Sequence, residues 1–178
     1  MDEHMVWIDL EMTGLDIESC SIIEIATVIT DGDLNIIATG PNLAIQTSEN
    51  DLAAMDEWNT THHNASGLVA RIRESQHSIA DAEVETLEFL RKYVEEGKAT
   101  LCGNSIWCDR KFIERQMPEL AAYLHYRMVD VSSFKEMAKR WYPNLPRYEK
   151  KGAHLALDDI LESIEELRYF REKIFIQD

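Results

Sequence analysis

The alternation of apolar and polar positions predicts three strands at the start of the chain. Residues 6–14, VWIDLEMTG, begin like the core of a buried strand and end at a Thr-Gly turn signal. Residues 21–30 and 34–45 are rich in β-branched side chains, and the DGD triplet between them is typical of a hairpin turn. This part of the chain therefore predicts an antiparallel meander.

Helical periodicity follows the meander. Residues 48–68 have a mixed pattern broken by a polar run at 59–66, which predicts two short helices joined by a loop. A longer pattern predicts a helix over 78–97, opened by a capping box and stopped by a glycine. Its cap, apolar stripe and stop are Ser78, Asp81, Val84, Leu87, Leu90, Val94 and Gly97.

Strands and helices alternate in the second half of the chain. A buried strand followed by a loop is expected at 99–106 and another strand at 126–132. Helices are expected at 108–124 (despite Pro118), 134–142 (capped by Ser133 and Glu136) and 155–174. A meander followed by alternating helices and strands predicts the α/β class. We expect a mixed five-stranded sheet, an antiparallel meander plus parallel strands, flanked by helices.

Length and composition are those of one globular domain, which we expect to span residues 1–178. No apolar run approaches the roughly 18 residues of a membrane span. The first strand starts so early that no signal peptide fits before it, and the three cysteines form no CxxC pair, which favours reduced thiols. These features predict a cytoplasmic protein without a membrane partner.

The net charge of -15 changes the picture of possible partners. A protein that grips long nucleic acid normally presents a basic face, and this chain has no Lys/Arg run long enough to line such a groove. The acidic balance indicates a small substrate, a protein partner or a cation. Metal ions could also convert an acidic cleft into a phosphate receptor.

Two carboxylates lie in the second half of the first strand. Asp9 and Glu11 would project from one face about 6.6 Å apart and repel each other by roughly 2.5 kcal/mol at an effective dielectric near 20. Solvent at a sheet edge could relieve this repulsion, and so could a divalent cation. With 33 acidic residues, about six acid-x-acid pairs are expected by chance, so the context decides.

Two further acids and a histidine are candidates for the same site. Asp109 begins a helix after a predicted strand, where the helix dipole alone would explain an acid. Asp159 could equally lie on a solvated helix face, like Asp158. A lone histidine such as His154 is more often structural, but its ordinary pKa near 6.5 suits a general base if the acids converge.

Five separated motifs carry a resemblance to a known family. WIDLEMTGL, WNTTHHNASGL, GNSIWCDRKF, HYRMVDVSSFKEMAKRW and HLALDDILESIEEL occur in order between about residues 6 and 175. Together they resemble the oligoribonuclease family, in the histidine-containing branch of the DEDD exonuclease superfamily. The resemblance implies an RNase H-like fold, a homodimer, and 3′-to-5′ hydrolysis of very short RNA to 5′-mononucleotides with two Mg²⁺ or Mn²⁺ ions.

The resemblance also assigns the catalytic residues. The acids that bind metal would be Asp9, Glu11, Asp109 and Asp159, and His154 would be the base that accepts a proton from the attacking water. The apolar stripe of the last helix would instead place Asp158 nearer the interior than Asp159. The spacing of the histidine and the acid in the family favours Asp159.

Substrate residues follow from the same resemblance. It implies base stacking on Leu15 and Trp58, although either could be a core residue, and a 5′-phosphate cap of Ser105, Arg127 and Ser132. His63 and Tyr126 would come from the partner subunit. Trp107 departs from the small residue usual in the family and could narrow the site. A longer-substrate exonuclease of the superfamily and a non-catalytic acidic module are the alternative functions.

Overall fold

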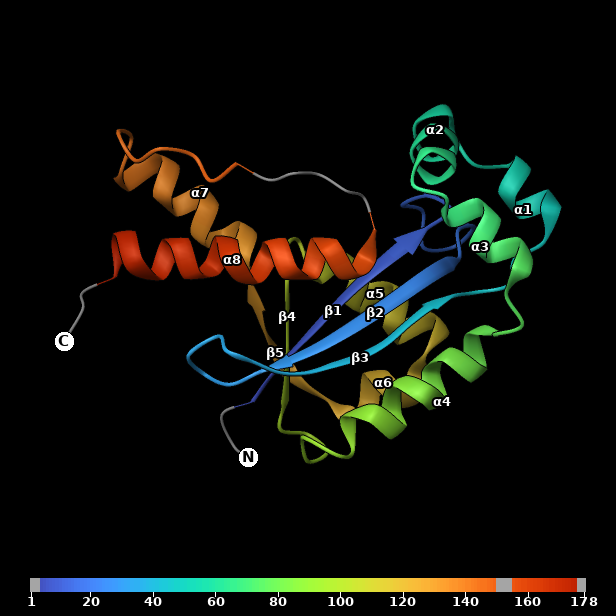
Figure 1. Cartoon of the computed structure of the whole chain (residues 1–178), viewed down its shortest axis with the longest axis horizontal. Helices are drawn as coiled ribbons and strands as arrows, with labels where there is room; N and C mark the ends of the chain where they lie inside the picture. Colours follow the sequence, from blue (N-terminus) through green and yellow to red (C-terminus); the bar gives the residue numbers. More distant parts are fainter. Residues whose placement is uncertain (1–3, 150–154, 176–178) are drawn as a thin grey trace.

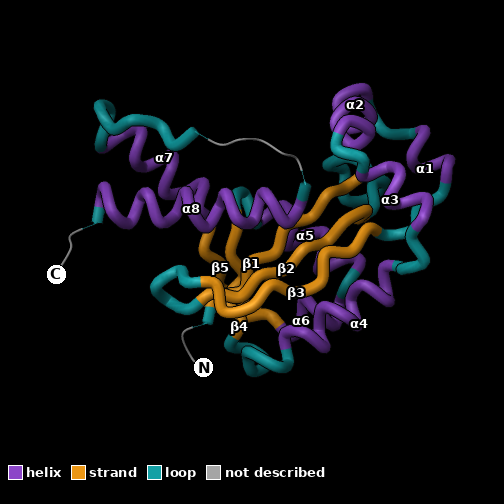
Figure 2. The backbone as a smooth tube through the Cα atoms, in the orientation of Figure 1, coloured by secondary structure: helices purple, strands orange, loops and turns teal. Residues whose placement is uncertain are grey.

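The computed structural model describes residues 4–149 and 155–175 and contains the expected mixed sheet (Figures 1 and 2). Its strand order is β3-β2-β1-β4-β5, with antiparallel pairing of β1 with β2 and β2 with β3, and parallel pairing of β1 with β4 and β4 with β5. The strands are β1 (Met5–Met12), β2 (Ile22–Thr30), β3 (Ile36–Ala44), β4 (Ala99–Gly103) and β5 (Leu124–Asp130). The predicted fold class is confirmed.

Helices cover both faces of this sheet (Figure 1). One face carries α7 and α8, whereas α4, α5 and α6 pack on the other face. The helices are α1 (Glu49–Ala53), α2 (Glu57–Ala65), α3 (Leu68–Glu74), α4 (Ile79–Leu90), α5 (Trp107–Gln116), α6 (Pro118–Tyr123), α7 (Val131–Trp141) and α8 (Ala156–Ile174). Within the described ranges, no helix is both long and apolar enough to cross a membrane.

Strand β1 lies in the middle of the sheet and sends alternate side chains to opposite faces. Ile8 and Leu10 join the core under α4, α5 and α6. Trp7 joins the core under α8. Asp9 and Glu11 share the parity of Trp7, so both carboxylates face α8.

The loop predicted at 59–66 is wrong, because α2 runs through most of it and α1 and α3 flank it as separate helices. The Asp56 side chain caps α2 by accepting the Asn59 N–H at 2.7 Å. Inside the helix, Asn64 Nδ2 donates to the carbonyl of Thr60 at 2.7 Å. The polar residues reflect a mostly exposed helix rather than a break in it.

Three other boundaries and the exposure of one residue also differ from the sequence prediction. Pro118 divides the helix expected at 108–124, because its ring suits the first position of α6 but not the interior of one long helix. Helix α4 ends at Leu90, and Gly97 lies beyond it with a φ of 72°. Val84 is exposed. The cap of α7 is Asp130, whose carboxylate accepts the Ser132 N–H.

Candidate active site

Three carboxylates converge where the end of β1 meets the start of α8. Asp9, Glu11 and Asp159 each offer an oxygen, and these oxygens all lie within 4.8 Å of one another. Asp9 and Glu11 face α8 from the sheet, and Asp159 lies in the first turn of that helix. The sequence prediction for these three acids therefore describes a real cluster.

The fourth predicted acid reaches β1 beyond the point where β4 stops pairing with it. Strand β1 pairs with β4 only as far as Trp7 and Cys102, so the backbone beyond needs another partner. Asp109, buried in the first turn of α5, accepts the Leu10 N–H at 3.0 Å. Asp109 is not one of the three acids whose oxygens lie within 4.8 Å of one another. Its hydrogen bond to the Leu10 N–H anchors the backbone between Asp9 and Glu11.

Burial and mutual repulsion shape the electrostatics of the cluster. The pKa of Glu11 rises from its ordinary 4.5 to about 8, chiefly by burial and then by the charges of Asp159, Glu24 and Asp109. Burial likewise raises the pKa of Asp109 to about 7. A cation bound here would offset the repulsion among the crowded carboxylates. Their oxygens are the ligands that hard divalent cations such as Mg²⁺ or Mn²⁺ prefer.

The metal-free protein should lose stability as the pH rises from about 5 to 8. Glu11 holds its proton more tightly in the folded chain than in the unfolded chain, so its contribution is fully present below pH 4.5 and is lost through about pH 8. Urea unfolding in EDTA at pH 5, 6.5 and 8 measures this slope. Glu11→Gln should reduce this slope, the remainder coming from Asp109, whose pKa is also raised, and an equal slope in that variant would contradict the assignment.

A fully buried acid that the sequence analysis missed supports the site. Glu24 lies directly across from Glu11 in the β1–β2 pairing and forms an ion pair with Arg71 of α3. Its other oxygen accepts the Ala156 N–H at 3.3 Å, so Glu24 fixes where α8 begins and hence where Asp159 lies. The signal in the sequence was an acid inside an otherwise apolar strand.

Removing the partner of Glu24 should destabilise the fold. Arg71→Met leaves a buried carboxylate without its cation, which should cost about 2 to 4 kcal/mol of unfolding free energy. Arg73→Met is the matched control, because Arg73 lies on the same helix in an exposed pair with Glu49, and its loss should change the unfolding free energy much less. Equal losses in urea unfolding would contradict a structural role for Glu24.

Asp159, rather than Asp158, is the acid at the cluster. Asp158 is exposed, whereas Asp159 is half-buried among the other acids. The inference from periodicity was wrong because Ala156 and Ile160 lead the buried stripe of α8, while Leu157 is only partly buried. That shift turns the helix so that the second acid of the pair meets β1.

One of the two predicted histidines lies inside the site of its own chain. His63 is 1% exposed, its Nε2 lies 3.1 Å from the carbonyl oxygen of Met12, and its Nδ1 lies 3.9 Å from Glu11 Oε2. Burial lowers its pKa, so the ring favours the neutral form. A side chain this buried does not fit donation to a partner subunit. His154 lies outside the described residues.

The predicted base-stacking residues are exposed, which rules out the alternative that they belong to the core. Leu15 is 77% exposed in the turn after β1, and Trp58 is 55% exposed on α2. Helix α2 lies beyond the end of β1 where the acids meet (Figure 1). The Trp58 indole stacks on the His62 ring, with centroids 3.9 Å apart.

The predicted phosphate cap is partly assembled. The hydroxyls of Ser105 and Ser132 lie 3.2 Å apart. Arg127 is exposed on the edge strand β5, where its guanidinium lies 5.3 Å from the centroid of the exposed Tyr126 ring. Trp107 is exposed at the start of α5, two residues before the buried Asp109. The Lys111 ammonium lies over the Trp107 ring.

Comparison with known proteins identifies the family. The RNase_T exonuclease model matches residues 6–167. The oligoribonuclease of Hydrogenovibrio crunogenus is 57% identical over 98% of this chain and 96% of its own length. That of Acinetobacter baylyi is 55% identical over 99% of this chain and 97% of its own. This chain belongs to the oligoribonuclease family.

Solved structures show that this oligoribonuclease-family chain has the exonuclease fold. Exonuclease I of Methylocaldum szegediense superposes with a TM-score of 0.72 at 16% identity, over 96% of this chain and 41% of that one. E. coli exonuclease I with a dA16 oligonucleotide gives 0.75 at 13% identity, over 97% and 41%. The chain thus spans well under half the length of these structures. The family and the fold together place it among the nucleases, which are hydrolases.

Proposed function

We propose that this chain is a metal-dependent 3′-to-5′ exoribonuclease that hydrolyses very short RNA, especially 5′-phosphorylated dinucleotides, to 5′-mononucleotides and so completes RNA degradation. The observation that carries the proposal is the convergence of Asp9, Glu11 and Asp159 at the end of β1. High identity to proteins named oligoribonuclease supports RNA as the substrate. The acidic cluster supports metal-assisted hydrolysis.

Two divalent cations, Mg²⁺ or Mn²⁺, would be held by Asp9, Glu11, Asp109 and Asp159. When bound, they supply a more acidic water and stabilise the charge that develops on the phosphodiester. The protein contributes preorganisation, since Asp9 and Glu11 are fixed on a central strand and Glu24 fixes the start of α8. Asp109 holds β1 through the Leu10 N–H.

The remaining predicted residues divide into proton transfer and substrate binding. His154 accepts the proton of the attacking water as general base. Leu15 and Trp58 offer exposed apolar surfaces for the two bases. Ser105, Arg127 and Ser132 bind the 5′-phosphate at the other end of the dinucleotide, with the guanidinium supplying charge-assisted hydrogen bonds.

A homodimer would complete this site. Strand β5 is an edge of the sheet and exposes Tyr126, Arg127 and Met128, which suits pairing with a second copy. In that assembly Tyr126 of the second copy would cover the phosphate end of the substrate, while His63 acts within its own chain. The free cysteines favour the reducing cytoplasm as the place of action.

The alternative functions fit the site less well. A non-catalytic acidic module would present solvated carboxylates, whereas Glu11 and Asp109 are desolvated with raised pKa values. The net charge of -15 disfavours a longer-substrate exonuclease. The decisive test is incubation of a 5′-phosphorylated diribonucleotide with Mg²⁺, with and without EDTA. Absence of metal-dependent mononucleotide release would overturn the proposal that the chain is a metal-dependent exoribonuclease.

We predict that kcat/KM is highest for 5′-phosphorylated dimers and falls with each added nucleotide. Each extra phosphate must be held against a negative protein, and a cap at the second nucleotide would obstruct the third. Arg127→Ala should weaken binding of the 5′-phosphorylated dinucleotide by roughly 1.5 to 3 kcal/mol, because it removes a charge-assisted pair with the phosphate. Equal rates on a dimer and a 20-mer at one ionic strength would favour the longer-substrate alternative.

A further inference from the structure

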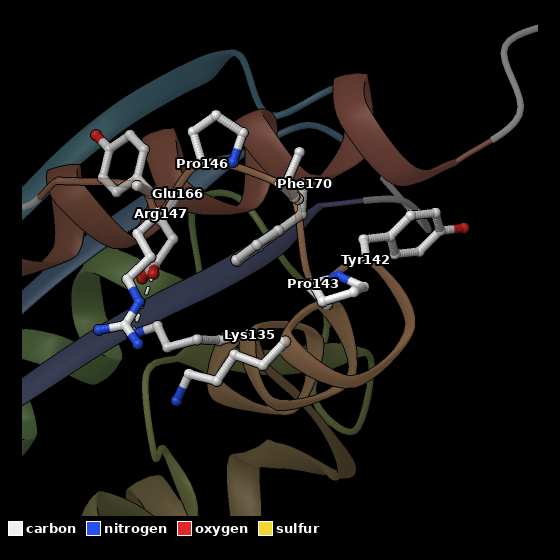
Figure 3. A pocket seen from close by; sticks show the side chains of 11 residues that line it. Lys135, Tyr142, Pro143, Pro146, Arg147, Glu166 and Phe170 are labelled. Atoms are coloured by element: carbon white, nitrogen blue, oxygen red, sulfur yellow. Dashed lines mark ion pairs between the residues drawn. The ribbon is translucent and has the colours of Figure 1, made fainter.

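A half-buried chain of polar side chains, with Glu166 as its fully buried member, contacts the two serines of the proposed phosphate cap. Ser132 Oγ donates to Asn104 Oδ1 at 3.1 Å, and Asn104 Nδ2 donates to Glu166 Oε2 at 3.0 Å. The other Glu166 oxygen lies 3.1 Å from the Lys135 ammonium, the ion pair drawn in Figure 3. We call Lys135, Glu166 and Asn104 the relay; it joins α7, α8 and the end of β4.

Next to Asn104 of the relay, the backbone of Ser105 has an unusual conformation. Ser105 has a φ of 51°, in the left-handed region that a non-glycine residue rarely adopts. Its N–H donates to Ser132 Oγ and to Asp130 Oδ1, each at 2.9 Å. A sparsely populated conformation persists only where its surroundings over-determine it, and such residues cluster at ligand-binding positions. The Ser132 hydroxyl that holds Ser105 is itself held by Asn104.

The middle member of the relay is the buried carboxylate of Glu166, which contacts both Lys135 and Asn104. Glu166 is 1% exposed among the buried residues of α8, and in general replacing a buried ion pair with hydrophobic residues of similar volume is often neutral or stabilising. Asn104 Nδ2 also donates to Ser163 Oγ at 2.8 Å, and that hydroxyl donates to the Asp159 carbonyl at 2.7 Å. One amide therefore connects the phosphate cap with the turn of α8 that carries Asp159.

We propose that Glu166, Asn104 and Lys135 are positioning residues that set the preference for a 5′-phosphorylated end. They touch no reacting atom; they orient the Ser132 hydroxyl and the Ser105 backbone that meet the phosphate. Lys135 fixes the rotamer of Glu166, Glu166 fixes the amide of Asn104, and Asn104 orients Ser132. This inference rests on the proposed function and assigns its specificity to side chains behind the substrate pocket.

The surroundings of Lys135 allow the relay to be tested without disturbing the core. Lys135 borders a surface cavity of about 440 Å³ between α7, α8 and the segment after α7. Tyr142, Pro146 and Phe170 line this cavity with it (Figure 3). The Lys135 side chain is 36% exposed, so Lys135→Met can lose its charge without overpacking. Lys135→Arg keeps the cation and serves as the rescue variant.

The test compares a 5′-phosphorylated and a 5′-hydroxyl diribonucleotide on the full chain with Mg²⁺. Glu166→Gln and Lys135→Met should each lower the ratio of the two kcat/KM values about tenfold, because a cap misplaced by less than 1 Å loses its contacts. The loss should fall on the KM of the phosphorylated dimer, and Lys135→Arg should restore most of it. Glu165→Gln, an exposed neighbour paired with Arg168, is the matched control and should keep the wild-type ratio.

A merely structural role would lower kcat/KM for both dimers by the same factor and leave the ratio unchanged, which overturns the inference. An unchanged ratio in Lys135→Met alone would also overturn it, since that variant does not depend on refolding a buried site. Dissociation constants of the two dinucleotides, measured in Ca²⁺ to suppress turnover, give the preference for the 5′-phosphate without hydrolysis. Wild-type protein that binds both dimers but cleaves neither would refute the proposed function and still test the relay.

Discussion

Asp159→Asn should lower kcat on the 5′-phosphorylated dimer by at least about 10³-fold. The substitution removes the negative charge of one of the three carboxylates whose oxygens meet within 4.8 Å, and a catalytic cation is worth several kcal/mol of transition-state stabilisation. Asp9→Asn should behave in the same way. Asp158→Asn is the matched control, because its side chain is exposed on the same helix turn, and it should retain activity within about twofold.

Stability separates a catalytic role for these acids from a structural one. Removing one carboxylate from a like-charged, desolvated cluster relieves repulsion in the metal-free protein, so the Tm of Asp159→Asn in EDTA should stay the same or rise. The added Mg²⁺ or Mn²⁺ that raises the wild-type Tm should have a smaller effect on the variant. A large fall of the Tm in EDTA would show that the acid is structural.

His154→Ala should leave cation binding intact and lower kcat by about 10²- to 10⁴-fold, the usual contribution of a general base. The acidic limb of the wild-type pH profile should be lost with it. The Mg²⁺-dependent rise in Tm measures cation binding in the same samples. Full activity in this variant would remove His154 from the mechanism.

His63 is the competing base, because its Nδ1 lies 3.9 Å from Glu11 Oε2. His63→Gln tests it with a residue that can keep a hydrogen bond to the carbonyl of Met12. If His154 is the base, this variant should keep the acidic limb of the pH profile, with a smaller loss of kcat than His154→Ala. A larger loss, with that limb removed, would assign the proton transfer to His63.

Local patterns in the sequence determined the strands and the placement of the first two acids. The alternation in VWIDLEMTG placed Asp9 and Glu11 on one face, and this holds because the pleat of a strand has a fixed period of two. The capping box of Ser78 and Asp81 is also present in α4, since its atoms lie within one turn. Five motifs in order were enough to recognise the family, because each carries its own chemistry.

Tertiary structure decided every feature that depends on partners far apart in the chain. The rotation of α8 that selects Asp159 over Asp158 follows from its packing on the sheet and from the buried Glu24, which lies 132 residues before Ala156 in the sequence. The burial of His63 beside Glu11 and the path of α2 through a polar segment likewise depend on contacts rather than on composition. The contacts of the relay residues with one another and with Ser132 also join segments that are far apart in the sequence.

The division between the two has one physical reason. Strand alternation, caps and charged motifs are set by interactions within a few residues, so the sequence by itself determined the strand that carries the first two acids, the fold class and the family. Helix rotation, buried ion pairs and shifted pKa values depend on which atoms exclude water from which others, and that is decided only when distant segments pack. The sequence and the family resemblance predicted the acids, and packing decided that Asp9, Glu11 and Asp159 meet and what holds them there.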